Sequence, residues 1–297
     1  ILRCLVGSEM CIRDRPGTRD ELKTAVDEWI VDPDDANSTY GHISTWDTSL
    51  ITDMSELFYD RWAFNDDISA WDVSSVTDME GMFYSTDYFN QDLSGWDVSN
   101  VVYMNEMFYY ATDFNQDIES WDVSSVTDMG AMFKFAEDFN QDISNWDVSS
   151  VNDMSYMFMG ATSFNQDISG WDVSNVNNMS GMFYSSWDFN QDITNWDVSS
   201  VTDMSWMFYS TDDFNQDLSG WDVSNVNDMG YMFSAAESFN QDLSNWDVSN
   251  VTDMGHMFHG ADDLSDSNKC AIHSSFSSND DWPYDWDCLL YTSDAAD

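Results

Sequence analysis

A fixed 25-residue period limits what this chain of 297 residues can fold into. Each unit reads W-D-V-S-S/N-V-T/N-D-M-x-x-M-F-x-x-A/T-x-x-F-N-Q-D-I/L-S-x, and nine copies fill residues 40–264 without insertion or deletion. A period of about 20–50 residues is typical of proteins whose units bury their apolar faces only by stacking on one another. The sequence therefore predicts nine stacked coils. Their tryptophans are Trp46, Trp71, Trp96, Trp121, Trp146, Trp171, Trp196, Trp221 and Trp246.

The apolar residues within one unit suggest the path of each coil. Trp71 and Val73 alternate with a polar residue, which is strand spacing, and a second extended piece follows. Met79, Met82 and Phe83 then fall at i, i+3 and i+4, the spacing of one helix face. We therefore expect strand, short strand and short helix in each coil, which makes an α/β solenoid.

The sequence on either side of the repeats departs from the period. Residues 16–39 include a T-x-x-E capping box and apolar residues at helical spacing over 18–30, so we expect an amphipathic helix that caps the first coil. Residues 265–288 are expected to form a C-terminal cap. Within it, Cys270 and Cys288 could either remain free or form a disulfide, which would stabilise the cap by about 3 kcal/mol and indicate an oxidising compartment.

The two ends of the chain resemble translated sequencing-adapter DNA. We expect residues 1–15 and 289–297 to be non-native and set them aside, as one would a cloning scar. A native signal peptide could be missing for the same reason, since residues 1–15 lack a proper apolar stretch. No segment approaches the 18 or more apolar residues of a transmembrane helix, so membrane insertion is not expected.

The block F-N-Q-D-I-S-x-W-D-V-S-x-V-T-D-M-x-x-M-F, repeated through residues 40–264, resembles the bacterial-surface-protein repeat of BspA-like leucine-rich-repeat proteins. Its I-x-x-W-x-V rhythm is one that leucine-rich repeats use. The resemblance implies a leucine-rich-repeat-like solenoid, in agreement with the nine α/β coils and the N-terminal capping helix expected above. It also implies a place on a cell surface or outside the cell, a role in adhesion or partner recognition, and no catalytic residue. No surface anchor or lipoprotein cysteine motif is visible.

The charge of the chain limits the kinds of molecule that it can bind. There are 56 acidic residues against 8 Lys and Arg, which gives a formal net charge of −48. Such a chain repels nucleic acid, acidic substrates and anionic membrane surfaces, and it favours cations and basic partners. At 42% hydrophobic and 16% aromatic residues it still has enough apolar surface for a packed core.

An aspartate follows every tryptophan, and these nine residues are called here the first Asp column. Stacked about 4.8 Å apart, neighbouring charges would repel by roughly 3.5 kcal/mol at an effective dielectric constant of 20. One interpretation is hydrogen bonding to the following serines and backbone N–H groups. The alternative is a row of Ca²⁺ ligands, but no calcium-loop spacing is present. The candidate ligands are Asp72, Asp97, Asp122, Asp147, Asp172, Asp197 and Asp222.

Two further polar columns have structural interpretations. The second Asp column is broken by Tyr103 and Asn178, which a strict metal ladder would not tolerate, so helix N-capping is expected there. The corner residues Asn65–Asn240 and Asp67–Asp242 resemble ladders that satisfy backbone donors between coils. The second Asp column consists of Asp53, Asp78, Asp128, Asp153, Asp203, Asp228 and Asp253.

Variation between units is concentrated next to the M-F pair, where aromatic residues recur. If exposed, these rings would form a strip suited to binding a protein or a glycan; otherwise they would shield the core. Lys134, Met159, Ser234 and His259 interrupt one of the two columns. The candidate binding residues are Tyr59, Tyr84, Tyr109, Tyr156, Tyr184, Trp206, Tyr209 and Tyr231.

The sequence offers no support for an enzyme. There is no G-x-S-x-G motif, no Cys–His constellation within the repeats and no glycine-rich phosphate loop. The periodic Trp, Met and Phe positions are expected to be core rather than a redox or haem environment, so no cofactor is expected apart from the Ca²⁺ alternative. His256 and His259 stand at i and i+3 near Asp253, but a zinc site would usually need a fourth ligand.

Overall fold

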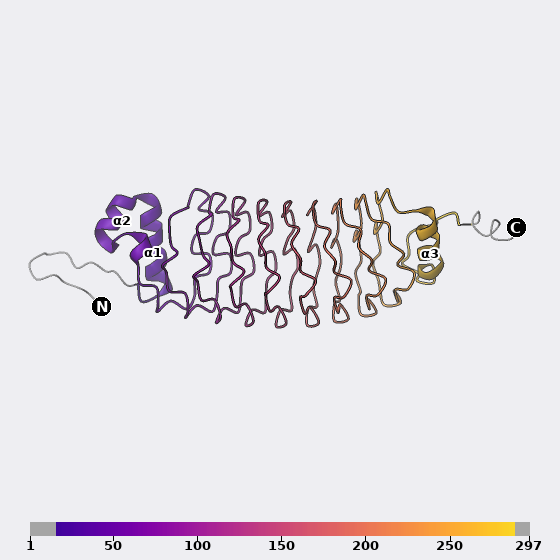
Figure 1. Cartoon of the computed structure of the whole chain (residues 1–297), viewed down its shortest axis with the longest axis horizontal. Helices are drawn as coiled ribbons and strands as arrows, with labels where there is room; N and C mark the ends of the chain where they lie inside the picture. Colours follow the sequence, from indigo (N-terminus) through magenta and orange to yellow (C-terminus); the bar gives the residue numbers. More distant parts are fainter. Residues whose placement is uncertain (1–15, 289–297) are drawn as a thin grey trace, which may run out of the picture.

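The repeats form an elongated stack of coils with helices at both ends (Figure 1). The structure is a computed structural model and describes residues 16–288. Helices α1 (Arg19–Val31) and α2 (Pro33–Tyr40) lie at the N-terminal end, and the short 3-10 helix η1 (Ile43–Thr45) leads into the first coil. Helix α3 (Asp266–Phe276) lies at the opposite end. The expectations for residues 1–15 and 289–297 fall outside the described residues.

The predicted α/β, leucine-rich-repeat-like solenoid is wrong. In the described part of the chain, the coils contain neither extended strands nor helices, and neighbouring coils are joined by isolated parallel β-bridges. These bridges involve the second Asp column together with Tyr103 and Asn178. The stretch predicted to be a short helix is instead a run of tight turns, called here the turn ladder.

Hydrogen-bond direction explains why the turn ladder is not a helix. The Phe83 N–H donates to the Met107 carbonyl of the next coil at 2.9 Å, whereas the Met82 N–H donates to Met79 within its own coil at 3.2 Å. An α-helix would need every N–H to donate four residues back along the chain. Apolar spacing at i, i+3 and i+4 is therefore satisfied here by consecutive turns, with alternate N–H groups used to join the coils.

The turn ladder places non-glycine residues in the left-handed region. Glu106 has φ 58° and Tyr110 has φ 56°, and equivalent pairs recur in the other coils. Such a conformation costs a non-glycine residue roughly 1–2 kcal/mol. The Glu106 and Tyr110 N–H groups each donate to the next coil at 2.8 Å, to Gly130 and Lys134 respectively. These inter-coil hydrogen bonds offset part of the strain.

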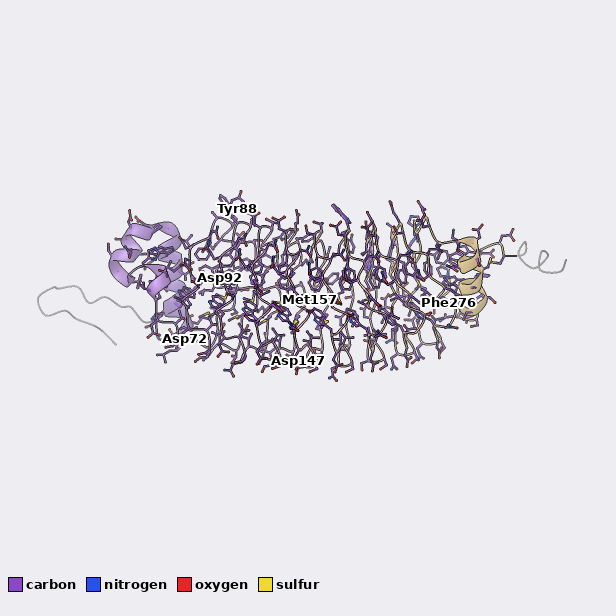
Figure 2. All side chains as sticks on the ribbon, in the orientation of Figure 1. Asp72, Tyr88, Asp92, Asp147, Met157 and Phe276 are labelled. Carbon is purple, nitrogen blue, oxygen red and sulfur yellow. A yellow bond between two sulfur atoms is a disulfide. The ribbon has the colours of Figure 1, made fainter. Side chains whose placement is uncertain are left out.

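The core is a set of buried columns that run along the stack, as the period predicts. The nine tryptophans that recur every 25 residues are 3–4% exposed, and the Met and Phe columns are buried, with Met157 in the interior of the stack (Figure 2). The Trp171 indole Nε1 donates to the Ile143 carbonyl of the preceding coil at 3.1 Å, and the other repeat tryptophans from 71 to 246 bond in the same way. Phe158 stacks on Phe183 of the next coil at 5.8 Å. The expected core is confirmed.

The asparagine corner ladder is also confirmed. The Asn115 Oδ1 accepts the Asn140 N–H at 3.1 Å and the Gln141 amide at 2.7 Å, both from the next coil. The aspartates at the same corner behave differently from the prediction. The Asp142 Oδ1 accepts the Ser144 N–H at 2.9 Å within its own coil, so these residues cap local turns rather than connect coils.

Each end of the stack supplies polar groups that replace a missing coil. At the first coil, the Arg19 guanidinium donates to the Ser55 carbonyl and pairs with Asp53 at 3.3 Å. At the last coil, the Tyr284 hydroxyl accepts the Phe258 N–H at 2.7 Å. A phenylalanine N–H at this position donates to the next coil elsewhere in the stack. A disulfide between Cys270 and Cys288 ties α3 to the segment that carries Tyr284.

Helix α1 begins as the capping box predicts. The Thr18 side chain accepts the Glu21 N–H, and Leu22, Val26 and Trp29 bury one face of the helix against the first coil. Among the described residues, no helix is both long enough and apolar enough to cross a membrane.

Candidate binding site

The candidate binding residues lie on the turn ladder, where their backbone is fixed by inter-coil hydrogen bonds. Tyr59 is 42% exposed, and the other seven candidates are partly exposed. Partial exposure is compatible with both predicted roles, a binding strip and a cover over the core. We call these eight residues the aromatic strip. Seven of its rings fall into two arrays, and Lys134 links the eighth, Tyr156, to the first array.

The first array is a face-to-face ladder of three tyrosines from successive coils. The ring centroids of Tyr59 and Tyr84 are 4.4 Å apart, and those of Tyr84 and Tyr109 are 4.5 Å apart, with interplanar angles of 14° and 13°. Burial, together with the neighbouring Tyr109 and Tyr59, raises the pKa of Tyr84 to about 12. The faces of the three rings are thus used within the ladder, and the Tyr84 hydroxyl stays protonated at physiological pH.

Lys134 occupies the next position of this tyrosine column. Its Nζ lies 4.9 Å from the ring centroid of Tyr109 and 5.0 Å from that of Tyr156. Both distances are within the range of a cation–π interaction. The residue that interrupts the aromatic column in the sequence thus connects two aromatic residues in the structure.

The second array lies toward the C-terminal end of the stack. Tyr184 stacks on Tyr209 at 4.6 Å, and Trp206 stacks on Tyr231 at 4.0 Å. Trp206 also contacts Tyr209 at 5.1 Å, so the two columns form one group, which His256 extends by stacking on Tyr231 at 4.8 Å. The structure thus brings the candidate residues together within each array.

Two aromatic residues of this surface were missed by sequence reasoning. Tyr110 and Phe135 stack at 4.5 Å, and Tyr110 also meets Tyr109 edge-on at 4.9 Å. They occupy the second left-handed position of the turn ladder, directly after the tyrosine column. Their adjacency to that column was a usable signal, but assuming a helix would have placed them on a different face.

The first Asp column is exposed along one long edge of the stack, where Asp72 and Asp147 lie, while Tyr88 lies at the opposite edge (Figure 2). The Asp147 Oδ1 accepts both the N–H and the hydroxyl of Ser149, at 3.1 and 2.6 Å. The same kind of contact with Ser174 lowers the pKa of Asp172. Each of the seven Ca²⁺ candidates accepts the N–H of the serine two residues on.

The second Asp column caps turns, not helices, which corrects the sequence prediction. The Asp128 Oδ1 accepts the Gly130 N–H at 2.9 Å, and Asn178 does the same for Ser180 at 3.1 Å. Because these side chains are half-buried, burial raises the pKa of Asp128, with Asp153 adding a smaller repulsion. The pKa of Asp228 is raised in the same way.

No group of three or more His, Cys, Asp or Glu residues is arranged to hold a metal ion in the described residues. His256 and His259 contact each other edge-on at 5.7 Å. Within residues 16–288 we therefore find no observation that favours the Ca²⁺ or zinc alternatives over the turn hydrogen bonds.

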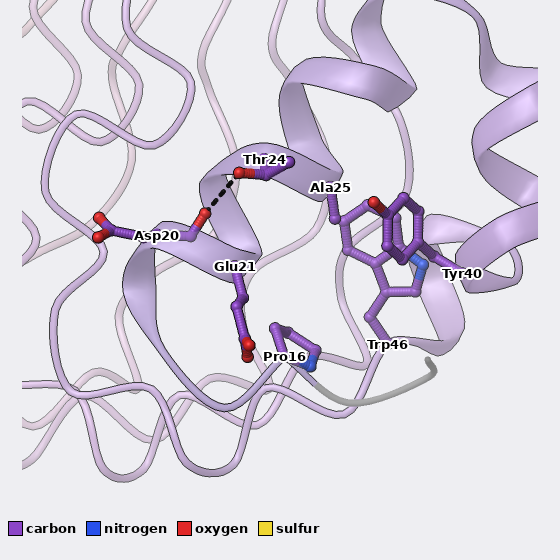
Figure 3. Close-up of a pocket in the computed structure, with 7 residues that line it drawn as sticks. All are labelled: Pro16, Asp20, Glu21, Thr24, Ala25, Tyr40 and Trp46. Carbon is purple, nitrogen blue, oxygen red and sulfur yellow. Dashed lines mark hydrogen bonds between the residues drawn. The ribbon is translucent and has the colours of Figure 1, made fainter. Parts of the chain in front are cut away.

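A pocket of about 240 Å³ lies in the N-terminal cap, away from the aromatic strip (Figure 3). The rings of Tyr40 and Trp46 lie together beside Ala25 of α1, and Pro16, Asp20, Glu21 and Thr24 complete the lining of the pocket. The Trp46 Nε1 is used within the fold, where it donates to the Gly41 carbonyl at 3.0 Å.

The chain is a repeat protein: its coils are nearly identical, and the side chains that vary between them are concentrated on the turn ladder. Its sequence matches the family model described as "Mycoplasma protein of unknown function, DUF285" over residues 32–137, 116–206 and 185–279, and the chain belongs to this family. A search of curated proteins finds none that matches it.

Proposed function

We propose that this chain is a non-enzymatic, BspA-like repeat protein, displayed on a cell surface or secreted, that binds a protein or glycan partner through the aromatic strip. One observation carries the proposal: side chains that differ from coil to coil collect where aromatic rings are accessible. The core columns, in contrast, are almost invariant. Because the backbone is the same in every coil, variation on the turn ladder changes surface chemistry without changing the scaffold.

Backbone strain supports a role for these side chains. Tyr156, Trp206 and Tyr231 have φ between 55° and 61°, where glycine would be free of strain. Gly181 occupies the same column in another coil, with φ 58°. Strained backbone is often found at functional positions. Because the fold imposes this backbone on every coil, the side chain at the position is free to vary, and Tyr and Trp are residues enriched in interfaces.

The proposed location outside the cell rests on two features. Disulfides persist mainly in oxidising compartments, and Cys270 and Cys288 form one in the C-terminal cap. The W-D-V-S and F-N-Q-D blocks also resemble those of BspA-like surface proteins. Protease digestion of intact cells tests this part: loss of the chain with the membrane intact is expected, and full protection would contradict it.

Binding can be tested with a matched pair of variants. We would present the native chain to glycan arrays and to extracellular-matrix extracts, and compare it with Tyr84→Ser/Tyr109→Ser/Tyr184→Ser/Tyr209→Ser. The control is Tyr88→Ser/Tyr103→Ser, two tyrosines outside the strip that are 52% and 47% exposed. The proposal expects a ligand that the strip variant loses and the control keeps. A folded native chain that captures nothing, or a ligand that both variants keep, would contradict it.

A further inference from the structure

We propose that the N-terminal array of the aromatic strip binds a Lys- or Arg-bearing segment of a partner protein. The surface consists of Tyr59, Tyr84 and Tyr109 with the carboxylates of Glu56, Glu80 and Glu106, and it is called here the acidic-aromatic patch. This inference rests on the proposed function, and it names the chemistry of the partner for one part of the strip.

The three carboxylates lie beside the tyrosine ladder in consecutive coils. Glu56 and Glu106 share one column, and Gly81 stands between them without a side chain. A Cβ atom at Gly81 would lie 3.7 Å from the Glu56 Cγ and 3.8 Å from the Tyr84 Cβ, so the space above this glycine is flanked by both. The Glu56 N–H donates to the Glu80 carbonyl at 2.8 Å, which fixes these two residues side by side.

The direction of the Glu106 pKa shift agrees with the close placement of the three carboxylates. Burial, followed by the Glu80 carboxylate, raises the pKa of Glu106, while Lys134 acts in the opposite direction. Glu56 adds to the repulsion. An external cation would relieve the repulsion among these carboxylates, and opposite charges across an interface steer association and select partners.

Lys134 shows within the chain how a cation fits this surface. It is the only Lys or Arg between residues 62 and 264. Its ammonium lies between the rings of Tyr109 and Tyr156, at the end of the tyrosine ladder and close enough to affect Glu106. The one Lys or Arg side chain in this part of the repeats is therefore seated beside Tyr109 and acts on Glu106. Because the faces of the stacked rings are occupied by one another, a partner's Lys or Arg would reproduce the pairing with the carboxylates.

The size of the patch fits a polypeptide segment better than a single amine. Coils joined by ladder hydrogen bonds repeat at about 4.8 Å, so three coils span roughly 10 Å. An extended peptide advances about 3.3 Å per residue, so side chains on one of its faces recur about every 6.6 Å, and two of them fit within the patch. Aromatic edges between the carboxylates would contact the aliphatic stems of Lys and Arg.

The test must distinguish specific binding at the patch from the general attraction of any cationic peptide to a chain with net charge −48. The probe is a fluorescein-labelled peptide in which glycine alternates with arginine, measured by anisotropy at physiological salt. Glu56→Gln/Glu80→Gln/Glu106→Gln removes three charges from the patch. Asp72→Asn/Asp97→Asn/Asp122→Asn removes three charges from the first Asp column. Circular dichroism verifies the fold of each variant.

We expect the patch variant to bind the peptide at least tenfold more weakly, and the Asp-column variant to change affinity by less than twofold. Equal weakening of both variants, or no binding by the native chain, would overturn the inference. These outcomes are distinct from a failure of the proposed function, which the serine variant of the strip tests. A ligand lost by the serine variant of the strip but kept by the patch variant leaves the proposed function intact and removes only the basic-segment partner.

Discussion

The ring of Tyr156 lies where a side chain at Gly181 would have to be. A Cβ atom built on Gly181 would come within 2.4 Å of two carbon atoms of that ring. Gly81 occupies the same column with nearly the same backbone, φ 55° against 58°, and its closest contact would be an ordinary 3.7 Å. The two glycines therefore separate the effect of ring contact from the effect of backbone strain.

We expect Gly181→Ala to destabilise the chain by about 1–3 kcal/mol more than Gly81→Ala does, because the added methyl must displace a packed ring. Left-handed strain and the change in unfolded-state entropy are common to both variants and cancel in the comparison. Urea unfolding followed by circular dichroism gives the difference. Equal stabilities would mean that Tyr156 is loosely held and that its position over Gly181 is not structurally important.

Tyr284→Phe is expected to loosen the C-terminal end of the stack. The variant removes the acceptor for the Phe258 N–H, and a buried donor left without a partner costs about 1–3 kcal/mol. Hydrogen exchange should therefore accelerate in the last coil more than in the middle coils, since each coil depends mainly on its neighbours. Tyr88→Phe, at an exposed position, is the control. Uniform acceleration along the stack would contradict this local role.

Trp171→Phe tests the indole hydrogen bonds that join the coils. The ring is buried, and its Nε1 donates to the Ile143 carbonyl, which also accepts the Trp146 N–H at 3.2 Å. The variant therefore loses packing volume and the one bond that joins this carbonyl to the next coil. We expect a loss of roughly 2–4 kcal/mol in the free energy of unfolding. Trp62→Phe should cost far less, because Trp62 is 58% exposed. Similar losses from both variants would show that the indole bond contributes nothing specific.

Asp128→Asn should raise stability at neutral pH. Since the pKa of Asp128 is raised in the folded state, folding takes up a proton there, and native stability falls as pH rises from the ordinary Asp value through the raised one. Asparagine keeps the acceptor for Gly130, as Asn178 does for Ser180, and Asn178 also donates to Asp153 at 3.2 Å. We expect a gain of roughly 0.2–1 kcal/mol at pH 7 from relieving a like-charge pair.

The gain should shrink as pH falls toward the ordinary pKa of aspartate, where the native Asp128 is protonated. Asp172→Asn is the matched control with the opposite sign. Its pKa is lowered by Ser174, so its charge contributes stability above the unfolded pKa that is lost as pH falls. Thermal unfolding across this pH range measures both variants, and a stabilising Asp172→Asn at pH 7 would contradict the assignment of the two columns.

The sequence was sufficient to predict the period, the buried columns, the N-terminal helix and the asparagine ladder, because a strict repeat forces equivalent residues into one environment. It failed for the turn ladder. Apolar spacing at i, i+3 and i+4 does not say whether an N–H donates within its coil or to the next coil. Gly81 and Gly181 in one column, and Gly160 and Gly260 in another, were the available signal, since glycine is poor in a helix and free in the left-handed region.

For the candidate binding site, the sequence predicted the columns but not their contacts. It treated Lys134 as an interruption of the tyrosine column, whereas its ammonium connects Tyr109 with Tyr156. The reach of a four-carbon lysine side chain to rings of the preceding and the following coil depends on the stagger between coils, which no single unit encodes. Tyr110 and Phe135 were missed for the related reason that the direction of a side chain follows from the turn type.

The contacts that close the two ends have a consequence for the length of the molecule. Arg19 bonds to a carbonyl of the first coil and Tyr284 to an N–H of the last, and both groups are ones that every coil carries. The contacts made by each cap therefore do not depend on the number of units between the caps. Insertion or deletion of whole units between the first and the last coil would leave both caps seated, so recombination between the gene's own repeats can lengthen or shorten the stack without losing either cap.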